Sequence, residues 1–112
     1  MEEVVFEVNG SSSEPYGVVF VKRSETNLSA YCSCRAGENS QSCKHRLSIL
    51  EGKTDGIVSS NLDQVKIVQS WLAGTDLEKN LKIMRQLESE ATRIKKELSF
   101  AKKSVSNAMH NK

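Results

Sequence analysis

Proline, aromatic residues and long apolar runs are all scarce in this sequence, which has one proline and six aromatic residues in 112. A chain of this size is too short for a doubly wound nucleotide-binding fold or a barrel enzyme, which need roughly 150–250 residues. No apolar run approaches the ~20 residues that span a bilayer, so no membrane association is expected. The first residues are acidic and alternate with apolar ones, unlike a signal peptide. We therefore expect a small intracellular protein, cytoplasmic or nuclear.

Cysteine is also scarce, and its odd number argues against a disulfide framework. The three cysteines lie close together as Cys32, Cys34 and Cys43, and His45 follows two residues after the last of them. The other histidine, His110, lies in the C-terminal tail. Four residues with soft or borderline donor atoms therefore stand within one short segment.

The spacing of these four residues predicts a metal site. Three thiolates and one imidazole complete the tetrahedral shell of Zn²⁺, and a closed shell of four protein ligands is structural. We expect Cys32 and Cys34 at a tight turn where a strand ends, because side chains two apart on a flat strand lie too far apart to chelate well. We expect Cys43 and His45 at the start of a helix. Three alternatives stay open: a redox pair of the first two cysteines, a catalytic cysteine–histidine pair, and unrelated thiols beside a surface histidine.

This pattern resembles the SWIM zinc finger, which is defined by C-x-C, a variable spacer and C-x-H. The spacer here has eight residues, and the resemblance covers roughly residues 16–52. It implies a ββα zinc finger with four ligands to Zn²⁺: Cys32, Cys34, Cys43 and His45. By the same resemblance, the two strands and the helix are residues 18–23, 28–32 and 43–51. SWIM modules are described as modules for DNA binding or protein–protein interaction within larger proteins, which is the role that the resemblance implies.

Alternating apolar and polar residues predict a small antiparallel β-sheet in the first third of the chain. The expected strands are residues 4–8, 17–23 and 28–32, and the last two are close enough for a hairpin. Residues 35–42 are polar and are expected to be irregular. A helix is expected from about Cys43, with Ser42 as its N-cap and Gly52 at its C-terminal end.

Helical periodicity dominates the second half of the chain. Apolar residues three and four apart predict a helix over residues 62–73, with Trp71 as an anchor in the core. A longer helix is expected over residues 76–107. Its start is marked by a capping box, in which Thr75 is the cap and Glu78 stands three residues later.

The long helix has an apolar seam typical of a coiled coil. The seam positions are Leu77, Leu81, Met84, Leu87, Ala91, Ile94, Leu98, Ala101 and Val105. Their spacing is that of a heptad repeat, with one residue missing between Met84 and Leu87. Thirty helical residues are about 45 Å long, too long for a small finger to cover. We therefore expect a homo-oligomer formed through residues 76–105.

Charge is distributed unevenly along the chain. Residues 1–56 contain six basic and eight acidic residues, whereas residues 57–112 contain ten and six. Together with the change from strands to helices, this shift predicts a zinc-finger domain with an extra N-terminal strand over 1–56. A helical segment with the oligomerisation helix is expected over 57–112. Five cations near the end form either the solvated face of a coiled coil or a surface for nucleic acid or an acidic partner: Arg93, Lys95, Lys96, Lys102 and Lys103.

The sequence as a whole predicts an α+β fold and a binding function. We expect a zinc-binding interaction module that self-associates through its C-terminal helix and acts as a protein–protein adaptor. The alternative is a DNA-binding regulatory protein that uses the zinc finger or the basic C-terminal helix. Neither enzyme activity nor a small-molecule substrate is expected, because the metal shell is closed and no glycine-rich phosphate loop is present.

Overall fold

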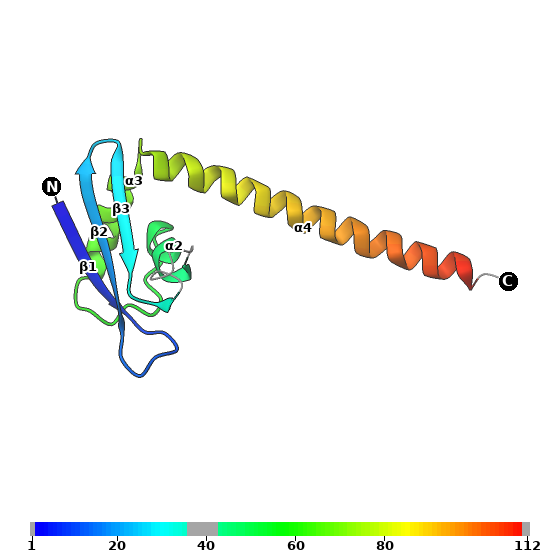
Figure 1. Cartoon of the computed structure of the whole chain (residues 1–112), viewed down its shortest axis with the longest axis horizontal. Helices are drawn as coiled ribbons and strands as arrows, with labels where there is room; N and C mark the ends of the chain where they lie inside the picture. Colours follow the sequence, from blue (N-terminus) through cyan, green and yellow to red (C-terminus); the bar gives the residue numbers. More distant parts are fainter. Residues whose placement is uncertain (1, 36–42, 111–112) are drawn as a thin grey trace. The chain divides into compact units, whose positions relative to one another are not determined.

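The computed structural model describes residues 2–35 and 43–110, and its α+β fold confirms the predicted class. Most of the stretch 35–42, which was expected to be irregular, lies outside the described residues. The elements are β1 (Glu2–Val8), β2 (Tyr16–Ser24), β3 (Asn27–Cys32), α2 (Lys44–Leu50), η1 (Leu62–Gln64), α3 (Val65–Leu72) and α4 (Asp76–Met109) (Figure 1). The chain divides into two compact units, residues 1–79 and 80–112. The first unit includes residues beyond 56, and the assignment of residues 1–56 to a domain of their own stays a prediction.

The three strands form an antiparallel meander in the order β1-β2-β3. Alternate residues of β1 are buried, as expected for a strand with one face against a core: Val4, Phe6 and Val8. Phe6 pairs with Val18 of β2, and its ring meets that of Phe20 edge to face, with the ring centroids 6.1 Å apart. On the other side of β2, Cys32 of β3 lies opposite Val18. The sheet register therefore sets the first predicted ligand beside the fully buried Val18.

The outer edge of β1 is covered by a later segment of the chain. The backbone N–H of Val58 donates to the carbonyl of Glu7 at 2.8 Å. The side-chain amide of Asn61 donates to the carbonyl of Val5, also at 2.8 Å. These bonds satisfy backbone groups that would otherwise offer an open edge to another strand. Residues 57–61 are thus hydrogen-bonded to the edge strand β1, a contact that the sequence did not predict.

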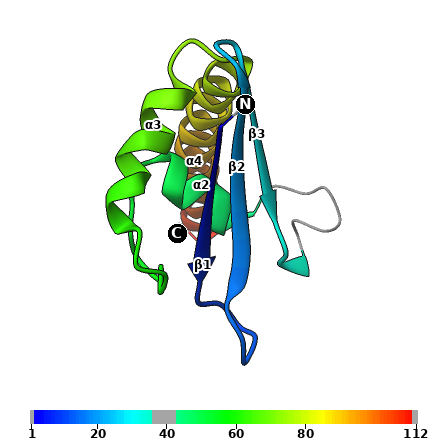
Figure 2. The ribbon, with the colours of Figure 1, turned by 90° about the vertical axis from the view of Figure 1, so that its left-hand side faces the viewer.

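Two short helices complete the core of the first unit. Figure 2 shows α3 beside the sheet with α2 next to it, and α2 contacts both α3 and β3. The buried residues of the two helices are Ile49, Leu50, Val65, Val68 and Trp71. The burial of Trp71, which is 8% exposed, confirms its predicted place in the core. The helix predicted over 62–73 begins as a 3-10 turn, in which Leu62 is exposed rather than part of the apolar face.

The cap predicted for the long helix is present in a modified form. The backbone N–H of Glu78 donates to Thr75 Oγ1 at 3.2 Å. The Glu78 carboxylate accepts from the N–H of Gly74, one residue earlier than in a standard capping box, at 3.2 Å. Gly74 has φ +81°, a left-handed conformation that favours glycine. From this start α4 continues to Met109 with no buried residue. Within residues 2–35 and 43–110, no helix has the length and apolarity needed to cross a membrane.

Candidate metal centre

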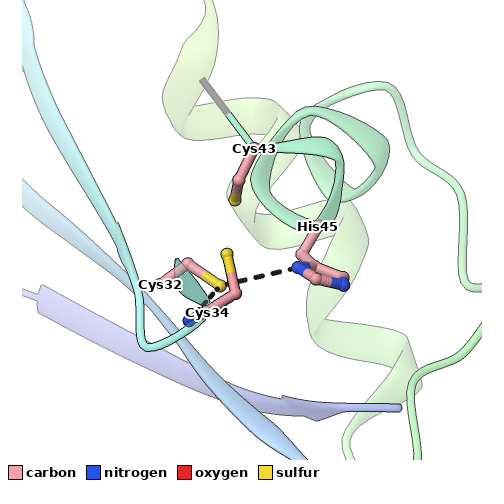
Figure 3. Close-up of side chains that lie close together, drawn as sticks. All are labelled: Cys32, Cys34, Cys43 and His45. Carbon is pink, nitrogen blue, oxygen red and sulfur yellow. Dashed lines mark hydrogen bonds between the residues drawn. The ribbon is translucent and has the colours of Figure 1, made fainter. Parts of the chain in front are cut away.

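The four residues predicted to bind metal come together between the end of β3 and the start of α2. Figure 3 shows their side chains pointing toward one another from these two segments. Each offers one donor atom, and the four donor atoms lie within 4.8 Å of one another. The three cysteines are buried with free thiols, and His45 is half-buried. Cys32 ends β3, and Cys43 is the N-cap of α2, so both predicted positions are confirmed.

The turn between the first two cysteines is held against β2. The backbone N–H of Ser33 donates to the carbonyl of Gly17 at 3.0 Å. The N–H of Gly17 in return donates to Ser33 Oγ at 2.9 Å. The N–H of Cys34 points back to Cys32 Sγ at 3.5 Å. This arrangement bends the chain after β3, so that both thiols face the same centre.

The second pair is positioned by the start of α2. Cys43 has an extended backbone, with φ −123° and ψ 143°, and its Sγ accepts the N–H of Arg46 at 3.5 Å. The cap is therefore Cys43 itself, whereas the predicted cap, Ser42, lies outside the described residues. The first turn of α2 places His45 beside the first pair, with its Nδ1 3.7 Å from Cys32 Sγ.

The donor set and its geometry fit a tetrahedral metal ion. A Zn–S distance of ~2.3 Å and a tetrahedral angle put ligand atoms about 3.8 Å apart. The donor atoms here all lie within 4.8 Å, and so require only small movements of side chains to reach that spacing. Three sulfurs and one imidazole nitrogen are the ligands that Zn²⁺ takes in structural sites.

Burial and hydrogen bonding act differently on the titratable groups of the cluster. Burial raises the pKa of the Cys32 thiol to about 12. Burial also acts to raise the pKa of Cys43, but hydrogen bonds from Arg46 and from the neighbouring thiols outweigh it and lower this pKa below its usual value. Burial and the nearby charge of Lys44 lower the pKa of His45. The lowered pKa values of Cys43 and His45 favour a thiolate and a neutral imidazole, which are the forms that bind metal.

Arg46 links the two halves of the cluster, a role that the sequence did not predict. Its Nε donates to Cys43 Sγ at 3.3 Å, and its Nη1 donates to the carbonyl of Ala30 on β3 at 3.1 Å. The guanidinium thus ties α2 to the strand that carries Cys32. Its positive charge also stabilises the net charge of −1 that three thiolates and Zn²⁺ would carry. A basic residue three positions after a ligand is too common a feature to reveal this role from sequence.

The far side of the histidine ring is enclosed by Tyr16 and Gly10, which the sequence did not link to the metal site. The ring of Tyr16 lies against His45, with the ring centroids 5.2 Å apart. A Cβ at Gly10 would collide with the Tyr16 ring and would lie 3.3 Å from His45 Nε2. That Nε2 is buried without a hydrogen-bond partner among the described residues. The ring therefore presents Nδ1, rather than Nε2, to the three thiols.

Comparison with known proteins yields no relative: no family model, curated protein or solved structure matches this chain. The link to SWIM fingers therefore depends on the ligand spacing and on the order of strands and helix. The metal centre itself depends on the donor set and its geometry.

Proposed function

We propose that this chain is a SWIM-type zinc-binding interaction module that self-associates through α4 and acts as a protein–protein adaptor. The observation that carries the proposal is the convergence of three buried thiols and one imidazole within 4.8 Å. The residues that would hold Zn²⁺ are Cys32, Cys34, Cys43 and His45. A bound Zn²⁺ would join the end of β3 to the start of α2.

The closed ligand set supports a structural role for the metal. Four protein ligands leave no position for water or substrate, so the proposal includes neither catalysis nor a small-molecule substrate. A unit of this size has a small core, and metal binding contributes folding free energy in such cases. Reduced thiols as ligands fit an intracellular, reducing compartment.

The exposed apolar residues of α4 support self-association. Four of them are between 53% and 59% exposed: Leu87, Ile94, Leu98 and Val105. Large apolar side chains that share one helix face commonly mark an interaction site. Another copy of the chain offers the same face, which makes it the simplest partner.

Zinc analysis combined with sedimentation equilibrium tests this proposal on the full chain. We expect one zinc per chain and a particle that contains more than one chain. A zinc-free protein with a fully ordered sheet would contradict the metal centre. A zinc-loaded monomer at all concentrations would contradict self-association and leave the metal centre standing.

A DNA-binding regulatory protein is the second candidate, and the positive charge of the C-terminal part of the sequence favours it. Residues 91–112 contain six basic residues and one acidic residue. Binding through these cations would be weak and sequence-tolerant, with a Kd of roughly 10⁻⁴–10⁻⁶ M that rises steeply with salt. The double variant Lys96→Glu/Lys103→Glu should then abolish binding to random duplex DNA, while Lys44→Glu in the finger should leave it intact. The reverse outcome would identify the finger as the DNA-binding element.

A further inference from the structure

The distal part of α4 has an uninterrupted heptad frame. From Met84 onward the core positions are occupied only by apolar residues. The a positions are Met84, Ala91, Leu98 and Val105, and the d positions are Leu87, Ile94, Ala101 and Ala108. No residue of α4 is buried, so this whole seam is available for contact. Its repeat of 3.5 residues is the one that a left-handed coiled coil requires.

Charges of opposite sign flank the two sides of the seam. On the g side, which precedes each a position, stand Glu90 and Glu97. On the e side, which follows each d position, stand Lys95 and Lys102. One further e residue, Glu88, forms an ion pair of 2.9 Å with Arg85 of the same helix.

We infer that the partner of this seam is a second copy of α4, parallel and in register. This inference rests on the self-association in the proposed function, and it adds the orientation of the two helices relative to each other. In a parallel pair, each g residue faces the e residue five positions later in the other chain. Glu90 then faces Lys95 of the second copy, and Glu97 faces Lys102 of the second copy, on both sides of the pair. In an antiparallel pair, g faces g and e faces e, so glutamates would face glutamates and lysines would face lysines.

The contacts of these glutamates within α4 do not oppose the pairing. Glu97 accepts from Arg93 at 3.1 Å, but both side chains are 64% exposed. Glu90 accepts from Gln86 at 3.3 Å. Exposed pairs of this kind contribute little and exchange readily.

The width of the seam supports two strands. Between residues 88 and 102 all the e and g positions on both sides are charged, so the apolar seam there is limited to a and d. Larger bundles bury part of the e and g positions, which would take these charges out of water. Two helices leave them at the solvent-exposed rim.

Charge exchange in the full, zinc-loaded chain tests the orientation by sedimentation equilibrium. The double variants E90K/E97K and K95E/K102E have opposite changes in net charge, yet both turn every g–e contact of a parallel pair into repulsion. Each contact contributes about twofold and a pair of chains has four of them, so each double variant should raise the dimer Kd about tenfold or more. The quadruple variant E90K/E97K/K95E/K102E restores attraction and the native net charge, and should return the Kd close to that of the native chain.

The outcomes separate the inference from the proposed function. If the native chain is a monomer, both the proposed self-association and the parallel orientation are contradicted. A native dimer that the double variants leave unchanged, or that the quadruple variant fails to restore, would reject the parallel orientation while self-association stands. A native trimer or larger assembly would reject the two-stranded form. Circular dichroism and zinc content, which should match in all variants, show that the substitutions leave the monomer fold intact.

Discussion

Single residues around the candidate metal centre set the pKa and the direction of the donor atoms. The sulfur of Cys43 is both a donor atom and the N-cap of α2, and Arg46 contacts it through a backbone and a side-chain N–H. Hydrogen bonds to a ligating sulfur lower its pKa and fix its direction. Arg46 would therefore act on a bound metal through Cys43, as a positioning residue rather than a ligand.

Arg46→Gln should weaken zinc binding about 10–100-fold while leaving one site per chain. The substitution removes the guanidinium bonds to Cys43 and Ala30, so the pKa of Cys43 rises and protons compete better with the metal. A chelator-competition titration at neutral pH measures the affinity. Lys53→Gln, which removes an exposed charge outside the cluster, is the control and should bind like the native chain. Equal affinities in the two variants would show that the guanidinium contact is incidental.

At the scale of elements, α3 stabilises the first unit through one apolar face. Trp71 is 8% exposed on this face, whereas Ile67 on the same helix is 41% exposed. Trp71→Ala should lower the free energy of unfolding by about 3–5 kcal/mol, because a large buried ring leaves a cavity. Ile67→Ala should cost less than about 1 kcal/mol. Urea unfolding of the zinc-loaded protein measures both, and similar losses would mean that α3 is not part of the core.

Local patterns in the sequence were sufficient to predict most of the elements. Alternation predicted the three strands, helical spacing predicted α3 and α4, and the ligand pairs predicted the ends that meet at the metal centre. What they did not predict depends on contacts between distant segments. The covering of β1 by residues 57–61 and the contact of Tyr16 with His45 belong to this class. The cap of α4 differs from the predicted capping box by one residue. Gly74 has a left-handed backbone conformation, and the Glu78 carboxylate accepts the N–H of Gly74 instead of that of Thr75.

At the scale of the whole molecule, the two compact units depend on different forces. The first unit combines a small core with the candidate metal centre, and the described part of the second is the distal part of α4, whose apolar seam is exposed. Removing zinc with a chelator should therefore unfold the sheet and the start of α2, because the metal contributes folding free energy there. The distal part of α4 should remain helical. Hydrogen exchange resolved by segment checks this, and unchanged protection of β2 and β3 after complete zinc removal would contradict it.

Native mass spectrometry of the zinc-loaded chain and its histidine variants tests the metal centre most directly. The chain has two histidines, and only His45 lies in the cluster. His45→Gln should lose zinc at chelator concentrations at which the native chain and His110→Gln each keep one ion, and Cys43→Ser should lose it as well. Full retention of zinc by His45→Gln and Cys43→Ser, with normal folding, would contradict the assignment of these residues as ligands.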